Sequence, residues 1–240
     1  MCTVTYIPSA TGYYLTSNRD EKITRKTAIL PNEYLEGDIK LIYPKDADAG
    51  GTWIVLKENG DSLCLLNGAF ENFIDAGQYT LSRGKIVLQI AASYNMVETF
   101  AEADFLQVAP FTLIVVNDSK LFECRWDGQQ KFIKVLNDAQ PHIWSSATLY
   151  DKAQQQLRKD WFNEWLKNNT APSWYEIYSF HKNTGDGNAV YDLVMNRSDT
   201  LFTVSITGIA MHPDACLMQY ADLKNNQNVT TAFSYQTALS

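Results

Sequence analysis

The beginning of the chain is rich in residues that favour β-strands. β-Branched and aromatic residues dominate residues 2–7 and 12–17, and a short break separates the two runs. Residues 52–57 and 62–66 form a second pair of runs, on either side of an Asn-Gly step. Because Asn-Gly readily adopts the two-residue turn that joins antiparallel strands, the second pair predicts a β-hairpin, and the first pair predicts another.

Helical spacing of apolar side chains is clearest over residues 152–168. Leu157, Trp161 and Trp165 recur there every fourth residue, with charged residues between them. Side chains at this spacing share one face of a helix, so the segment predicts an amphipathic helix that lies on a sheet. Asp151 stands at the position expected of its N-cap. Three more helices are predicted at residues 84–93, 97–105 and 172–181.

Further strand-like runs follow the first pair of predicted helices. Strands that gather in hairpins, with pairs of helices between them, indicate an α+β layered fold in place of alternating βαβ units. No repeat, low-complexity segment or Pro/Gly/Ser-rich linker divides the sequence, so we expect a single domain over residues 1–240. The predicted runs are residues 111–116, 120–126, 131–135, 190–195 and 201–207, the last two paired as a hairpin.

Composition narrows the range of partners. The 240 residues carry 20 basic and 27 acidic side chains, a formal net charge of -7, and no run of Lys and Arg. This balance argues against nucleic acid as a partner. No apolar stretch approaches the roughly 20 residues that span a bilayer, and the first residues lack the features of a signal peptide. We expect a cytoplasmic protein with no integral membrane segment, whose partner is a small-molecule substrate or ligand.

Metal-binding patterns are not found in the sequence. Cys2, Cys64, Cys124 and Cys216 are far apart and form no Cys-X-X-Cys pair, so reduced thiols are expected in place of a disulfide framework. The histidines are not spaced as a metal triad. We therefore expect neither a metal site nor a cofactor.

Candidate chemistry lies at the N-terminus. A cysteine at position two is small enough for the initiator methionine to be removed, which leaves a thiol and a free α-amine on Cys2. An unperturbed α-amine has a pKa of about 7.7–8.0 and a thiol of about 8.5. Near neutral pH the amine can therefore accept the thiol proton as the sulfur attacks a carbonyl carbon. Taken alone, a Met-Cys start is more often a small buried residue on a first strand.

Two further motifs accompany the N-terminal cysteine. Asn-Arg-Asp-Glu occupies residues 18–21, at the end of the second predicted strand, and Ala-Gly-Gly-Thr-Trp occupies residues 49–53. Together with Cys2 they resemble the signature of the NRDE family, which includes the transport-and-Golgi-organisation homologues. This family is related to the cysteine N-terminal-nucleophile (Ntn) hydrolases, such as bile salt hydrolases and penicillin V acylases. The resemblance covers most of the chain and implies a four-layer αββα sandwich.

The resemblance also implies roles for individual residues. Cys2 matches the nucleophile of the Ntn hydrolases, and Asp20 matches the aspartate that contacts the N-terminal amine. Asn67 falls where the relatives place an asparagine of the oxyanion hole, although a turn residue before Gly68 is an equally good interpretation. Arg19 would favour the thiolate. Adjacent strand residues face opposite sides, so Arg19 and Asp20 both reach Cys2 only if the chain bends there.

Two later residues are candidates for substrate binding. Ser146 stands where many relatives carry an asparagine, and a hydroxyl has neither the reach nor the two donors of an amide. This departure weakens the case for turnover by the relatives' mechanism. Arg197 resembles a late arginine of the relatives, whereas the simpler interpretation of a charged residue in a turn is exposure to solvent.

The resemblance favours a hydrolase or acyltransferase that acts on an amide or acyl-thioester bond of a small molecule through a thioester on Cys2. A competing interpretation is a non-catalytic binding or trafficking protein that keeps the fold and handles haem- or lipid-related cargo, although the sequence holds no Cys-X-X-Cys-His haem-attachment motif. A third is a folded relative whose pocket has lost its function. Only the first interpretation requires the removal of Met1.

Overall fold

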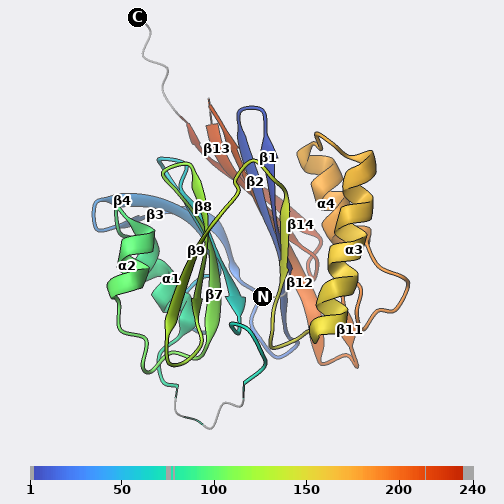
Figure 1. Cartoon of the computed structure of the whole chain (residues 1–240), viewed down its shortest axis with the longest axis horizontal. Coiled ribbons are helices and arrows are strands. Elements are labelled where there is room, and N and C mark those ends of the chain that lie inside the picture. Colours follow the sequence, from blue (N-terminus) through green and yellow to red (C-terminus); the bar gives the residue numbers. More distant parts are fainter. Residues whose placement is uncertain (1–2, 74–76, 78, 214, 235–240) are drawn as a thin grey trace, which may run out of the picture.

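Two β-sheets packed face to face form the centre of the protein, and a pair of helices covers the outer face of each sheet (Figure 1). The computed structural model describes residues 3–73, 77, 79–213 and 215–234. The layers follow one another as helices, sheet, sheet and helices. The predicted α+β class and its four-layer αββα arrangement are therefore confirmed.

The first sheet contains β1 and β2, the predicted N-terminal hairpin, in which Thr3 lies opposite Asn18. Its order is β10-β1-β2-β12-β13-β14, with the short β11 beside β12, and neighbouring strands are antiparallel. The strands are β1 (Thr3–Ser9), β2 (Gly12–Lys22), β10 (His142–Ser145), β11 (Asn196–Arg197), β12 (Leu201–His212), β13 (Ala215–Asp222) and β14 (Gln227–Ser234).

The second sheet is an antiparallel meander, in which strands adjacent in sequence are adjacent in space. The predicted turn at Asn59 and Gly60 joins β5 to β6, and Gly60 has the positive φ of +87° that glycine adopts readily. The strands are β3 (Ile29–Glu36), β4 (Ile39–Lys45), β5 (Ile54–Lys57), β6 (Ser62–Asn67), β7 (Phe111–Asn117), β8 (Lys120–Trp126) and β9 (Lys131–Leu136).

Capping boxes start the two helices that cover the first sheet, α3 (Lys152–Asn168) and α4 (Trp174–Asn183). The Asp151 side chain accepts from the Gln154 amide, and the Ser173 side chain accepts from the Glu176 amide. The outer face of the second sheet carries α1 (Arg83–Ala91) and α2 (Met96–Glu102), and that of the first carries α3 and α4 (Figure 1). In the described part of the chain, no helix is both long and apolar enough to cross a membrane.

Apolar side chains fill the space between the sheets. Val4 and Leu15 from the first sheet, and Ile54 and Cys64 from the second, are fully buried in this core. Tyr13 joins them, and its hydroxyl donates to the Gly60 carbonyl at 2.7 Å. Since side chains alternate along a strand, odd-numbered residues of β2 face the second sheet and even-numbered ones face the helices.

One predicted strand does not form. The prediction for residues 190–195 is wrong, and only Asn196–Arg197 pairs with β12. The carbonyl oxygens of this segment bind side chains instead: Arg158 donates to two of them and Asn18 to a third. Backbone groups that are already occupied in this way do not form a ladder with a neighbouring strand.

Several strands have no counterpart in the predicted elements, namely β3, β4, β10, β13 and β14. Three of them, β3, β10 and β14, lie at sheet edges, and β3 contains Pro31. An edge strand leaves one row of amide groups unpaired, so it tolerates a proline that would argue against a central strand. Tertiary pairing therefore decides the structure of segments whose local pattern is weak.

Candidate functional site

The Asn-Arg-Asp-Glu motif lies at the end of β2, where neighbouring side chains face opposite sides of the first sheet. Arg19 contacts Asp46 and Trp53, at the two ends of the loop between β4 and β5, whereas Asp20 contacts Tyr150, which precedes α3. The register between β2 and β12 shifts opposite these two residues, between Thr203 and Ser205. Such an irregularity bends a strand locally. The extra residue, Val204, belongs to β12, so the irregularity lies in the partner strand, and the side chains of Arg19 and Asp20 stay on opposite sides of the sheet.

Arg19 is buried between the sheets and bound by carboxylates. Its guanidinium lies 2.7 Å from the Asp46 carboxylate and 3.4 Å from that of Glu21. The same group lies 4.4 Å from the ring centroid of Trp53, which is a cation–π distance. These contacts fix the guanidinium in a single orientation at one wall of a cavity.

Asp46 organises the charges around Arg19. Burial alone would raise the pKa of Asp46, but the hydrogen bond from the Ala49 amide and the guanidinium groups of Arg25 and Arg19 lower that pKa below its ordinary value. Asp46 is therefore ionised at neutral pH and offsets part of the arginine charge. The second sequence motif, residues 49–53, thus has a physical role: its first residue binds Asp46 and its last lies against Arg19.

Asp20 is buried and accepts two hydrogen bonds from neutral donors. The Tyr150 hydroxyl donates to one carboxylate oxygen at 2.9 Å, and the Thr203 hydroxyl donates to the other. A carboxylate has about four acceptor positions. The geometry leaves Asp20 with acceptor capacity for a further donor.

Asn18 has a structural role in the motif. Its side-chain amide donates to the carbonyls of His181 and Leu193, at 3.1 and 2.7 Å, and these bonds fix its orientation. Its carbonyl oxygen therefore accepts from Nδ1 of His181, and Nε2 of His181 accepts from the Thr5 hydroxyl at 2.7 Å. Burial, together with the nearby Arg158 charge, lowers the pKa of His181 to about 3. This network joins β1 and β2 to α4.

Asn67 ends β6 and is held from its backbone. The Ser146 hydroxyl donates to the Asn67 carbonyl at 2.8 Å and lies 3.0 Å from the Thr148 hydroxyl. Ser146 is fully buried. The next residue, Gly68, has a φ of +81°, and a Cβ there would lie 2.9 Å from Thr148. The sequence resemblance places Ser146 at a substrate, whereas in the structure it binds the end of β6.

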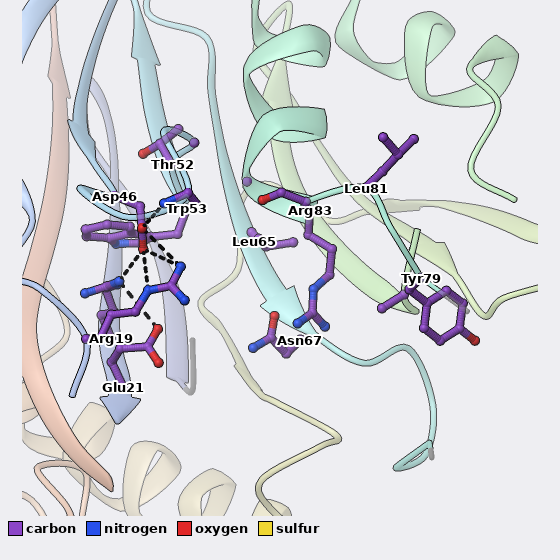
Figure 2. A pocket seen from close by; sticks show the side chains of 16 residues that line it. Arg19, Glu21, Asp46, Thr52, Trp53, Leu65, Asn67, Tyr79, Leu81 and Arg83 are labelled. Carbon is purple, nitrogen blue, oxygen red and sulfur yellow. Dashed lines mark hydrogen bonds and ion pairs between the residues drawn. The ribbon is translucent and has the colours of Figure 1, made fainter. Parts of the chain in front are cut away.

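A polar cavity of about 340 Å³ brings Arg19 and Asn67 together. Figure 2 shows Arg19, Glu21 and Asp46 on one side of it, and Asn67 and Arg83 on the other. A polar substrate group would thus lie between a guanidinium wall and the Asn67 side chain.

Arg197 does not line this cavity. Its guanidinium donates to the Leu149 and Val190 carbonyls at 2.8 and 3.2 Å, and lies 5.1 Å from the Tyr150 ring centroid. It lines a second cavity, of about 500 Å³, whose wall also includes Tyr150 and Tyr191. Tyr150 therefore connects the two regions, since its ring lines the second cavity and its hydroxyl binds Asp20.

Cys2 lies outside the described residues, and Thr3 is the first residue whose environment is described. Thr3 lies opposite Asn18 on β2 and opposite Ser145 on β10. Its hydroxyl accepts a hydrogen bond from Arg158 of α3. Arg19 and Ser146 directly follow these two partners of Thr3, and Asp20 follows Arg19 on β2.

Sequence reasoning missed Arg158 and Tyr150. Arg158 and Phe162 are the buried residues of α3, and they lie four positions apart on the same face. An arginine at an apolar position of an otherwise regular amphipathic helix is the signal that identifies it. Tyr150 carries no comparable signal, because it lies in the turn before the helix.

The three cysteines in the described part of the chain, Cys64, Cys124 and Cys216, are buried. Cys64 and Cys124 are fully buried, and burial raises the pKa of each thiol to about 12. The described residues contain no cluster of three or more His, Cys, Asp or Glu side chains that would hold a metal ion.

Comparisons with known proteins agree with this architecture. Residues 1–222 match the family described as Transport and Golgi organisation 2. No curated protein matches the chain in sequence. Among solved structures, the protein is similar to a mutant of the conjugated bile acid hydrolase from Clostridium perfringens, with a TM-score of 0.62 and 11% identity, over 98% of this chain and 97% of that one.

A second enzyme has a similar fold. The Caenorhabditis elegans ortholog of N-acylethanolamine-hydrolyzing acid amidase aligns with a TM-score of 0.61 and 14% identity, over 87% of this chain and 92% of that one. Another variant of the bile acid hydrolase aligns with a TM-score of 0.58 and 10% identity, over 100% and 98% of the two chains. At identities this low, the structural similarity shows the fold alone, which is that of the Ntn hydrolases.

Proposed function

The chain belongs to the Transport and Golgi organisation 2 family, and from this premise we propose that it is an N-terminal-cysteine hydrolase or acyltransferase. Its substrate is a small molecule with an amide or acyl-thioester bond. The observation that carries the proposal is that Arg19 and Asn67 line one cavity, and that Arg19 follows Asn18, the residue of β2 that lies opposite Thr3. Asp20 is next to Arg19 on the other face of the sheet.

Strand geometry supports the assignment of Cys2 as the nucleophile. Consecutive Cα atoms are about 3.8 Å apart, so Cys2 cannot be far from Thr3. The residues that follow the two partners of Thr3, which are Asn18 and Ser145, are Arg19 and Ser146. Side chains alternate along a strand, and Val4, an even-numbered residue of β1, belongs to the core between the sheets. That is also the side of Arg19 and Asn67.

The opposite orientations of Arg19 and Asp20 suit two different groups of one residue. A cysteine thiol on the inter-sheet side would lie near Arg19, whose positive charge favours the thiolate. Asp20, which Tyr150 and Thr203 hold on the helix side, is in this proposal the partner of the α-amine. One residue can thus be contacted from both faces of the sheet.

The proposed reaction begins when the α-amine of Cys2 accepts the thiol proton as the sulfur attacks the substrate carbonyl carbon. The Asn67 side-chain amide donates to the resulting oxyanion. The bond to the leaving group then breaks, the ammonium returns its proton to the leaving amine or thiol, and a thioester remains on Cys2. Water or an acceptor amine, deprotonated by the α-amine, attacks the thioester, and the thiol regains its proton.

Ser146 and Arg197 act outside this chemistry in the proposal. Ser146 fixes the backbone of Asn67 through its hydrogen bond to the Asn67 carbonyl. Arg197 lines the second cavity next to Tyr150 and would contact a part of the substrate remote from the scissile bond. The serine that replaces the relatives' asparagine is then a positioning residue.

Two measurements test the proposal. Intact mass of the protein from its own host is expected to show a chain that begins at Cys2, because only then is the α-amine free. Iodoacetamide at neutral pH is expected to label Cys2 well before Cys64 and Cys124, whose burial raises their pKa to about 12. Cys2→Ala is expected to remove the rapid labelling while leaving stability unchanged.

Other outcomes would redirect the proposal. Retention of Met1, or labelling of Cys2 at the rate of the core cysteines, contradicts a catalytic thiol and favours a non-catalytic binding protein. Fast labelling with no turnover across amide, thioester and acyl-acceptor panels points to a reactive pocket that has lost catalysis. Cys2→Ser retains the amine, so a weak residual activity is expected from it.

A further inference from the structure

We propose that Arg158 is a positioning residue of the N-terminal site, which fixes the start of β1 against the Tyr150–Asp20 pair and supplies the positive charge that keeps Cys2 reactive. The inference rests on the function proposed above. It concerns a residue of α3 that does not line either cavity described at the site.

Arg158 is buried in an unusual way for an arginine. Its residue surface is 1% exposed. In the described part of the chain, no carboxylate forms an ion pair with it. Removing a charged group from water without a counter-ion costs free energy, so a protein retains such a group only where its contacts or its charge compensate.

The contacts of Arg158 converge on the N-terminal site. One guanidinium nitrogen donates to the Thr3 hydroxyl, and another donates to the Tyr191 and Asp192 carbonyls, each at 2.9 Å. The guanidinium carbon lies 3.7 Å from the ring centroid of Tyr150. One side chain therefore touches both the residue after Cys2 and the ring whose hydroxyl holds Asp20.

Position is the first contribution of these contacts. Chain termini are poorly ordered unless something ties them down, and a displacement of about 1 Å can reduce a reaction rate a hundredfold. The hydrogen bond to Thr3 ties the start of β1 to α3, and the stacking on Tyr150 ties the same helix to the donor of Asp20. Thr3, the residue after the nucleophile, and Tyr150, which donates to Asp20, are thereby both fixed to α3.

Charge is the second contribution. A fixed positive charge near the N-terminal residue lowers the pKa of the thiol, which makes its proton easier to remove, and it lowers the pKa of the α-amine, so that the amine is unprotonated near neutral pH and can accept that proton. Other charged groups also surround the site. They are Arg19, Asp20 and Glu21 from β2, Arg25 and Asp46 from the loops after β2 and β4, Arg83 from α1, and Arg197 from β11. From α4 comes His181, which is neutral because its pKa is about 3.

A purely structural role predicts a different result. Arg158 also binds the backbone of the segment that follows α4, so its loss will lower stability in either case. Only the proposed role predicts a change in the pH dependence of Cys2 reactivity. The test therefore compares labelling profiles of folded proteins.

The experiment measures the rate of iodoacetamide labelling of Cys2, by mass spectrometry, from pH 5 to pH 10 in the processed full chain. Arg158→Met retains much of the side-chain volume and removes the charge. Its labelling midpoint is expected to rise by about one pH unit, with labelling at pH 7 slower by about tenfold. Arg158→Lys keeps the charge and is expected to recover most of that rate.

The control is Lys57→Met, which removes another buried cation, 3% exposed, that contacts the Ser93 carbonyl and lies outside the site. It is expected to lose stability and retain the wild-type profile. If Arg158→Met does not fold, Arg158→Gln carries the same test. A folded uncharged variant with the wild-type profile overturns the inference alone, whereas slow labelling of Cys2 in the wild type overturns the proposed function.

Discussion

Mild acid is expected to destabilise the protein through His181, which is buried between β1, β2 and α4. Its ring accepts from the Thr5 hydroxyl and donates to the Asn18 side chain, so the folded protein holds the neutral tautomer. Burial and the Arg158 charge lower its pKa to about 3. In the unfolded chain the ordinary value of about 6.5 applies. The proton therefore binds the unfolded state more tightly.

The sign and size of the effect follow from linkage. A group whose pKa is depressed by folding contributes stability that is fully present above the unfolded value, near pH 6.5, and is lost as the pH falls toward the folded value. Between pH 7.5 and pH 5 the expected loss from His181 is about 2 kcal/mol, and at pH 6 it is about 0.8 kcal/mol. The loss stops near pH 3, where the folded protein also takes up the proton.

The assay is urea unfolding followed by tryptophan fluorescence at pH 7.5 and pH 5. Carboxylates such as Asp46 also titrate, so the informative quantity is the difference between proteins. His181→Gln keeps a donor and an acceptor for Asn18 and Thr5. It is expected to be less stable at pH 7.5 but to show about 2 kcal/mol less pH dependence than the wild type.

A matched control separates titration from destabilisation. Phe180→Leu weakens the same helix by removing apolar contacts from a residue that is 2% exposed, and it removes no titrating group. Its free energy of unfolding is expected to be lower than that of the wild type by the same amount at both pH values. If His181→Gln loses as much stability on acidification as the wild type does, the histidine is not held neutral and the argument fails.

Two further predictions concern the walls of the site. Asp46→Asn leaves Arg19 buried without its closest carboxylate, so a loss of about 3 kcal/mol is expected in urea unfolding at pH 7, and an unchanged midpoint would show that the ion pair contributes nothing. Gly68→Ala places a Cβ 2.9 Å from Thr148, at a backbone φ of +81°. Its control is Gly187→Ala, where φ is +88° but no atom lies close to the new Cβ, so that only the free-energy cost of the backbone conformation remains. That cost is about 1–2 kcal/mol in each variant. Gly68→Ala is expected to lower the melting temperature more than Gly187→Ala does, because it adds the contact with Thr148. Equal decreases in the two variants would mean that the turn after β6 relaxes without cost.

Local signals were sufficient for the elements with strong patterns. The bounds of α3, Lys152–Asn168, and of β8, Lys120–Trp126, agree with the sequence prediction. An apolar stripe at helical spacing and a capping box act over a few residues, and so do the residues of a tight turn. The resemblance of the N-terminal motifs then predicted the four-layer fold, which no local pattern specifies.

The partners of the site residues could only come from the tertiary structure. Asn18 binds His181, 163 positions later, and Arg158 binds Thr3, 155 positions earlier. Such pairs depend on strand register, on the layer that a helix covers and on the side of the sheet that a residue faces. Asn67 was equally compatible with a turn and with the site. The Ser146 hydrogen bond to its backbone and the cavity beside its side chain are properties of packing.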